Sequence, residues 1–162
     1  DKGKDFNISN CGMHAMDIMR MESGFLHWGH DISPEENQYE ANLKFLISLK
    51  KNFDFIGKES LLKMKDEKPK KRLIMLCLQK SKPGEPLMLH DEPIYLDNKI
   101  IGVTTSGNYS FNFNKNLSFG YIKSDHSNLE LSKKNLFIEI EKIKYPAKVL
   151  LSPLKQTDFK KM

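Results

Sequence analysis

The sequence GEPLMLHDEPIYLDNKIIGVTTSGNYSFNFNKNLSFGYI, residues 84–122, decides the fold of this chain. Within it, two apolar stretches, residues 94–96 and 99–101, flank the dipeptide Asp97-Asn98. We expect Asn98 to take the positive φ that a short hairpin connection requires. The pattern therefore predicts a tight antiparallel β-hairpin.

Further short apolar or alternating segments surround this hairpin, and glycine, asparagine and proline separate them. Short strands at such spacing are typical of a small barrel or a sandwich. The second half of the chain is thus predicted to be almost entirely β-structure. We expect the additional strands at residues 73–78, 103–109, 117–122, 136–141 and 147–151.

The first half of the chain contains a predicted helix, GMHAMDIMRME at residues 12–22. Ser9 or Asn10 is a candidate N-cap, and Gly24 stands where a helix commonly ends. Apolar residues, many of them methionine, occupy most of the helix circumference, and this predicts a buried helix. Its polar side chains, Arg20 among them, then need partners in the protein or on a ligand.

After this helix we expect a loop, then a strand at residues 43–49 and a short helix at residues 57–64. A polar, lysine-rich stretch ending near Pro69 separates this part from the β-rich part. The sequence therefore predicts two domains, residues 1–68 and residues 69–162.

Composition excludes several classes of function. The chain has 26 Lys and Arg against 21 Asp and Glu, but only two of the 26 are arginine. Specific readers of nucleic acid rely on arginine, so we expect no nucleic-acid partner. A membrane span needs about 20 consecutive apolar residues, and the sequence has no such run, so we expect no membrane partner. Cys11 and Cys77 have apolar neighbours, which predicts reduced core cysteines in a cytoplasmic protein.

The sequence offers no clear catalytic or metal-binding constellation. His27 and His30 have a His-x-x-His spacing, which on a loop is weak evidence for a metal ligand pair. A phosphate-binding loop, a nucleophile elbow and a dinucleotide-binding glycine motif are all missing. We therefore predict neither a catalytic residue nor a metal site.

Two long segments nevertheless resemble a known family. Residues 12–57 resemble the pattern G-x-x-A-x-[DN]-S-L-R-[LM]-E-x-G-[YF]-x-x-W-G-x-[DE]-[IL]-[ST]-P, then x-E-A-G-L, then D-F-I-G, of the glycine-cleavage T-protein (aminomethyltransferase) superfamily. Residues 84–122 resemble its G-x-E-P and T-S-G-x-Y-S motifs, and Pro146-Ala147 resembles its late P-A-x-[VL] strand. The motifs are collinear over nearly the whole chain. Within the superfamily the chain looks most like the C-terminal folate region of sarcosine and dimethylglycine dehydrogenases.

The departures from the family pattern are informative. Asn42 stands where the family has glycine, Gln38 where it has proline, and Ile18 where it has serine. T-proteins carry a folate-contacting arginine at the position of Met16, whereas the dehydrogenases tend to have an apolar residue there. Met16 therefore favours the dehydrogenase branch.

The resemblance implies an α+β fold: the tail of an α/β folate-binding domain, with helix, strand and short helix, followed by a small antiparallel β-barrel. Family folate modules are more than twice as long as this chain, so we expect a C-terminal piece of a larger enzyme that is inactive in isolation. The implied cofactor is tetrahydrofolate, with FAD in an upstream portion. The implied partners are folate and the missing N-terminal portion or a flavin-containing domain or subunit, in the cytoplasm or, in a eukaryote, the mitochondrial matrix.

The resemblance also implies where folate is held. Phe25 would stack on the pterin where T-proteins use a tyrosine, and Trp28 would line the same cavity. Arg20 and Glu22 would contact the ligand or hold the helix to its neighbours. Thr105-Ser106-Gly107 is expected to form a turn near the seam between the domains.

Three functions remain open at this point. The first is part of a folate-dependent demethylating dehydrogenase, the second is an aminomethyltransferase of the glycine cleavage system, and the third is a non-catalytic regulatory or binding module. The pyruvate dehydrogenase phosphatase regulatory subunit, which resembles the same dehydrogenases, is an example of the third. Without its partner portion the methionine-rich helix would expose an apolar patch, which predicts a homo-oligomer or poor solubility.

Overall fold

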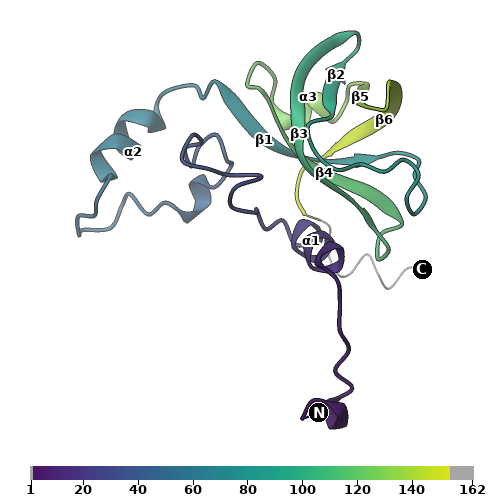
Figure 1. The fold of residues 1–162 in the computed structure, drawn as a ribbon. Helices are drawn as coiled ribbons and strands as arrows, with labels where there is room; N and C mark the ends of the chain where they lie inside the picture. The colour runs from purple at the N-terminus through teal and green to yellow at the C-terminus, as the bar shows by residue number, and fades with distance from the viewer. Residues whose placement is uncertain (1, 154–162) are drawn as a thin grey trace.

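The second half of the chain forms a closed antiparallel barrel (Figure 1). The computed structural model describes residues 2–153. Around the barrel the strands follow the order β1-β4-β3-β2-β5-β6, and β1 pairs with both β4 and β6. This confirms the predicted barrel and excludes the sandwich. The strands are β1 (Lys71–Leu78), β2 (Pro93–Leu96), β3 (Lys99–Ser110), β4 (Lys115–Lys123), β5 (Leu136–Ile140) and β6 (Ile143–Leu150).

Strand β1 explains why the barrel needs a helix outside it. Its apolar run is buried from residue 73 to residue 78, although alternate side chains point to opposite faces. Ile74, Leu76 and Leu78 belong to the core inside the barrel. The intervening side chains belong to a second cluster on the outer face, which Ile18 and Met21 of helix α1 (Met13–Glu22) complete.

Two glycines allow β3 and β4 to pair closely. A Cβ atom on Gly102 would lie 1.9 Å from the Tyr121 carbonyl oxygen, and one on Gly120 would lie 2.7 Å from the Val103 carbonyl oxygen. Both would collide with backbone that the ladder holds in place. The positions therefore require glycine.

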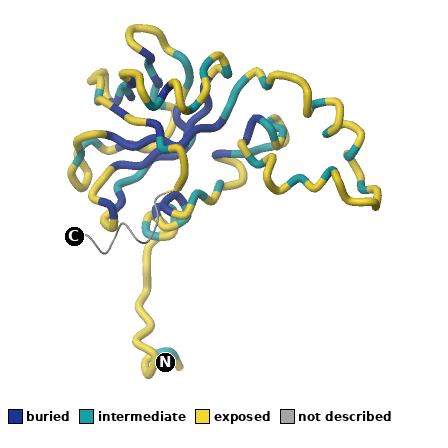
Figure 2. The backbone as a smooth tube through the Cα atoms, turned by 180° about the vertical axis from the view of Figure 1, so that it is seen from behind, coloured by how far each residue is buried: buried dark blue, intermediate teal, exposed yellow. Residues whose placement is uncertain are grey.

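Residues 33–70 leave the barrel and form a projecting arm, which we define by this range (Figure 1). The arm carries the 3-10 turn η2 (Lys44–Leu46) and the helix α2 (Lys58–Lys65). Most of it is exposed or half-buried, in contrast to the buried strands (Figure 2). The remaining short helices are η1 (Lys4–Phe6) and α3 (Asn128–Leu131).

The strand predicted at residues 43–49 is wrong. The only regular element there is η2, and its N-terminal neighbour Leu43 already has φ −102° and ψ 16°. The alternation of apolar and polar residues stabilises a strand only where another strand can pair with it. The arm offers no such neighbour among residues 2–153, so the local pattern does not decide the conformation.

Several local predictions also need correction. Gly12, with no side-chain hydrogen bond, is the N-cap of α1 in place of Ser9 or Asn10. In the hairpin connection Asp97 has the positive φ of 54°, and Asn98 does not. Cys11 is exposed, because it precedes the helix on an extended segment, whereas Cys77 is buried as predicted.

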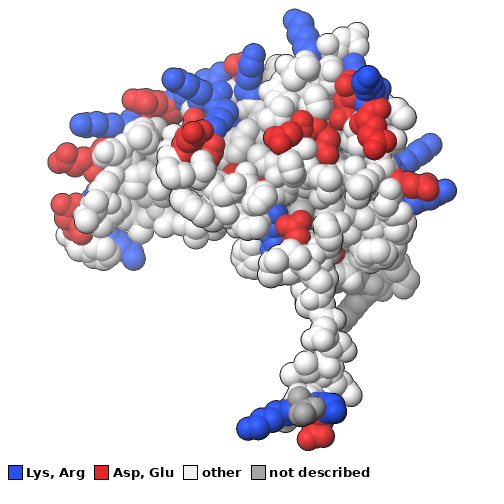
Figure 3. Space-filling view, in the orientation of Figure 1, with Lys and Arg blue, Asp and Glu red and all other residues white. Residues whose placement is uncertain are grey.

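Helix α1 is buried on one face and not on nearly all sides, which agrees with the apolar patch expected on this helix without its partner portion. Ile18, Met21 and Glu22 are buried against the barrel, but Met13, Met16 and Met19 are at least half exposed. The barrel covers only one face of the helix, and no other described element covers the opposite face. The surface around α1 is correspondingly poor in charge, whereas charged side chains gather over the arm and the upper barrel (Figure 3).

Candidate functional site

A buried carboxylate, Asp31, joins helix α1 to strand β3. Its side chain is fully buried and forms an ion pair with the Arg20 guanidinium. Oδ1 accepts hydrogen bonds from Thr105 Oγ1 at 2.6 Å and from Ser106 Oγ at 2.8 Å. Oδ2 also accepts the backbone N–H of His27 at 2.9 Å. Every donor around this carboxylate is therefore supplied by the protein, as burial of a charge requires.

Arg20 is held from several directions. Its Nε and Nη2 donate to Asp17 Oδ1 at 2.9 and 2.6 Å, and Nη2 also donates to Ser106 Oγ at 2.8 Å. Nη1 donates to the Phe25 carbonyl at 3.3 Å, in addition to its pairing with Asp31. The guanidinium therefore fixes the start of the loop that follows the helix.

Glu22 anchors the other end of α1. The residue is 8% exposed, and its carboxylate accepts hydrogen bonds from Ser110 Oγ at 2.5 Å and Asn112 Nδ2 at 2.8 Å. Both partners lie at the end of β3 and the turn that follows. The helix is thus attached to the barrel at two charged points, Arg20 and Glu22, and neither is directed to open solvent.

The predicted turn at Thr105-Ser106-Gly107 is wrong, because these residues lie within β3. The register between β3 and β4 shifts between Thr104 and Ser106, which is a β-bulge. In a regular strand neighbouring side chains point to opposite faces. The bulge lets Thr105 and Ser106 donate to the same oxygen of Asp31.

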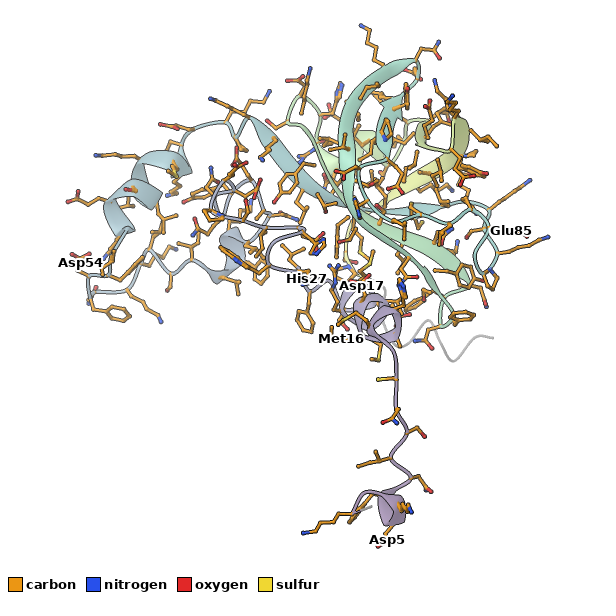
Figure 4. The ribbon with its side chains drawn as sticks, in the orientation of Figure 1. Asp5, Met16, Asp17, His27, Asp54 and Glu85 are labelled. Carbon is orange, nitrogen blue, oxygen red and sulfur yellow. The ribbon has the colours of Figure 1, made fainter. Side chains whose placement is uncertain are left out.

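A cleft of about 300 Å³ lies beside this network. Four of the five histidines of the chain line it. The rings of His27 and His30 stack with their centroids 4.5 Å apart, and Met16 and Asp17 flank the cleft from α1 (Figure 4). The lining residues are Met13, His14, Met16, Asp17, Arg20, His27, His30, Leu89, His90, Thr105, Ser106 and Gly107.

Phe25 and Trp28 follow the helix on the same loop but do not meet in one cavity. Phe25 is 68% exposed and lines a second, mostly apolar cavity of about 500 Å³ together with Leu26, Phe45 and Phe119. Trp28 is 64% exposed and lines neither this cavity nor the histidine-lined cleft. Sites for small organic molecules have volumes of about 300–1,000 Å³ and mostly apolar walls. The cavity at Phe25 has the size and the mostly apolar lining of such sites.

Arg20, Glu22, Phe25 and Trp28 remain predicted site residues. Asp31 was not among them, although the family pattern has an acidic residue at its position. Within residues 2–153 no group of three or more His, Cys, Asp or Glu side chains is placed to hold a metal ion. In the same part of the chain, every helix is too short or too polar to cross a membrane.

Comparison with known proteins gives matches along most of the chain. Residues 1–51 match the family model described as the GCVT N-terminal domain, and residues 71–155 match the glycine cleavage T-protein C-terminal barrel domain. Human mitochondrial dimethylglycine dehydrogenase is 34% identical over 158 residues, 96% of this chain and 17% of that protein. The aminomethyltransferase of Symbiobacterium thermophilum is 31% identical over 127 residues, 78% of this chain and 33% of that protein.

A solved structure has the same fold. The glycine cleavage system aminomethyltransferase T from Bartonella henselae superimposes with a TM-score of 0.78 and 23% identity, over 95% of this chain and 42% of that one. A second relative of the oxidase kind, the 4-methylaminobutanoate oxidase (formaldehyde-forming) of Paenarthrobacter nicotinovorans, is 33% identical over 94% of this chain and 18% of its own length. The chain thus spans only a small part of the curated relatives that it matches.

Proposed function

Because the chain belongs to the glycine cleavage T-protein family, we propose that it is the C-terminal portion of a tetrahydrofolate-dependent demethylating dehydrogenase of the sarcosine and dimethylglycine type. The observation that carries this proposal is Met16, which lies on α1, lines the cleft and stands where T-proteins carry a folate-contacting arginine. The extent of the likeness does not separate the two branches. Human dimethylglycine dehydrogenase matches 96% of this chain at 34% identity, and the aminomethyltransferase of Listeria welshimeri matches 94% at 32% identity.

Tetrahydrofolate, when bound, accepts the one-carbon unit that amine oxidation releases. In this chain Phe25 would provide a face for the pterin, since its ring is exposed beside a cavity with mostly apolar walls. Trp28 lines neither cavity, so it would contact the ligand only where a further portion of protein extends the pocket toward it. Arg20 and Glu22 would hold the helix and the loop in position, because protein partners already occupy both side chains.

The site needs a further portion of protein. Phe25 lines one open cavity, and Met13 and Met16 of α1 line a separate cleft, so neither surface encloses a ligand of this size, which is held where most of its surface is buried. We propose that an N-terminal folate-binding portion supplies the opposite wall. FAD, which amine oxidation requires, would belong to a flavin-containing domain or subunit outside these 162 residues.

A chimera tests this proposal. The segment of human dimethylglycine dehydrogenase that matches this chain is replaced by residues 1–162, and tetrahydrofolate binding is measured by calorimetry. We expect the chimera to bind folate and the isolated chain to bind it weakly or not at all. Phe25→Ala in the chimera should weaken binding by about 1–3 kcal/mol, the free energy of burying one large apolar side chain.

Phe53→Ala is the matched control, because Phe53 is 57% exposed and lines neither cavity at α1. This control should leave folate affinity unchanged. A folded chimera that binds no folate would contradict the proposal. If Phe25→Ala and Phe53→Ala weaken folate binding equally, Phe25 does not contact the ligand. A parallel chimera is built on the Symbiobacterium aminomethyltransferase. If only this chimera binds folate, the aminomethyltransferase function replaces the dehydrogenase proposal.

A further inference from the structure

Residues 27–32 form a closed turn at the end of the loop that follows α1. The His27 carbonyl accepts the backbone N–H of Asp31 at 2.8 Å, and the Ile32 carbonyl accepts that of Gly29 at 2.8 Å. Gly29 has φ 89°, a backbone conformation that glycine adopts without strain. The backbone of this turn is therefore held by its own hydrogen bonds, although the tip of the turn is exposed.

The barrel holds this turn at Asp31. The side chain of Asp31 accepts the Thr105 and Ser106 hydroxyl groups. Its backbone carbonyl accepts the Tyr121 hydroxyl at 3.0 Å. These three donors come from the paired strands β3 and β4. Both the side chain and the backbone of one buried residue are thus attached to the barrel, so the strands fix the position of the turn.

Ser106 connects the same attachment to Phe25. Its hydroxyl donates to Asp31 and accepts from Arg20 Nη2, at 2.8 Å in each case. Arg20 contacts the Phe25 backbone on both sides. Its Nη1 donates to the Phe25 carbonyl at 3.3 Å, and its own carbonyl accepts the Phe25 N–H at 2.8 Å. One residue of β3 therefore contacts both charged groups that hold the loop.

We propose that Thr105 and Ser106 are positioning residues for the folate site, because together they fix the loop at residues 25–32. This role rests on the proposed function. Both hydroxyl groups are already used by Asp31, so they act on the ligand through the loop. In a regular strand only one of two neighbouring side chains would face Asp31, and the bulge brings both to it. A loop held in its binding conformation loses less entropy when the ligand binds.

Thr104, the preceding residue on β3, separates positioning from stability. Its hydroxyl donates to the Glu92 carboxylate and accepts the Glu92 N–H at 2.9 Å, and the residue is fully buried. Removing that hydroxyl leaves buried polar groups unpaired on the same strand, but it removes no hydrogen bond of Arg20 or Asp31. Thr104→Val is therefore the matched control for Thr105→Val.

The first test uses the full chain without any ligand. Trp28 is the only tryptophan of the chain and lies in the turn, so its fluorescence reports the loop. The double variant Thr105→Val/Ser106→Ala should lower the Trp28 anisotropy, because loop motions on the nanosecond scale become possible. Thr105→Ser, which keeps the hydroxyl, should retain the wild-type anisotropy, and Thr104→Val should retain it as well.

Urea denaturation is measured on the same variants, and we expect both the double variant and Thr104→Val to unfold at lower urea concentration. A merely structural role of the bulge predicts the same anisotropy in these two variants. Wild-type anisotropy in a folded double variant, or an equal decrease in Thr104→Val, overturns the proposal. If the double variant does not fold, Ser106→Ala alone provides the same test, because it removes one hydroxyl.

The second test measures tetrahydrofolate affinity by calorimetry in the chimera with human dimethylglycine dehydrogenase. The double variant should weaken binding about threefold to tenfold, because the loop and the Phe25 side chain must then be ordered on binding. Thr105→Ser and Thr104→Val should stay within about twofold of the wild-type affinity. Wild-type affinity in the double variant contradicts the positioning role alone. A wild-type chimera that binds no folate contradicts the proposed function, and the positioning role with it.

Discussion

Replacing Asp31 by alanine should be among the most destabilising single substitutions in the chain. The change removes the only buried carboxylate that pairs with Arg20 and leaves three further donors, Thr105 Oγ1, Ser106 Oγ and the His27 N–H, without their acceptor. Breaking a buried ion pair from one side costs about 3–5 kcal/mol, and the loss here should lie near the lower end of that range because Asp17 still pairs with Arg20. A domain of this kind has a total free energy of unfolding of about 5–15 kcal/mol, so this loss is a large part of it.

Urea denaturation followed by circular dichroism measures the change. The matched control is Asp125→Ala, since Asp125 pairs with Lys68 at 3.8 Å but both side chains are about two-thirds exposed. An exposed pair contributes about 0–1 kcal/mol, so the control should change the free energy of unfolding by less than about 1 kcal/mol. If Asp31→Ala costs no more than Asp125→Ala, the network does not hold α1 to the barrel, and our account of the site is wrong.

Three further predictions follow from burial and charge. A thiol reagent should modify exposed Cys11 rapidly and Cys77 slowly, because burial raises the pKa of the Cys77 thiol, and equal rates would contradict the fold around β1. Burial, and then the charges of nearby carboxylates, raise the pKa of Tyr121 above its ordinary value of 10.0. The unfolded chain therefore loses the Tyr121 proton at a lower pH than the folded chain. The free energy of unfolding should fall as the pH rises above 10. Tyr121→Phe should flatten that fall in urea titrations, and an unchanged slope would refute the assignment. The isolated chain should self-associate through the uncovered face of α1. In light scattering, the double variant Met16→Gln/Met19→Gln should shift the chain toward monomer. A wild-type monomer of 18.8 kDa at all concentrations would contradict this prediction.

The barrel was largely predictable because its signals are local. The hairpin around Asp97 and the alternation at residues 136–140 each contain the strand, its turn and its buried face within a few residues. The burial of both faces of β1 was not predictable from that strand alone. It depends on α1, whose packing partner lies far along the chain.

The contacts of the candidate site were less predictable from the sequence than the barrel. The sequence indicated that Arg20 and Glu22 need partners, but the partners of Arg20 include Ser106, which is 86 residues away. Such a contact depends on the barrel topology and on the bulge in β3, and neither has a strong local signature. The strand predicted in the arm at residues 43–49 was wrong for a related reason, because an alternating pattern forms no strand without a neighbouring strand to pair with.

The pairing of β1 with β6 has a consequence for biosynthesis. Met75 lies opposite Leu150, so the first barrel strand to leave the ribosome closes against the last. Until then one border of β1 presents free backbone N–H and C=O groups, which are a template for pairing with another nascent chain. Premature termination before residue 143 would leave that border open permanently. Quality control of this protein therefore depends on the complete translation of its final strand.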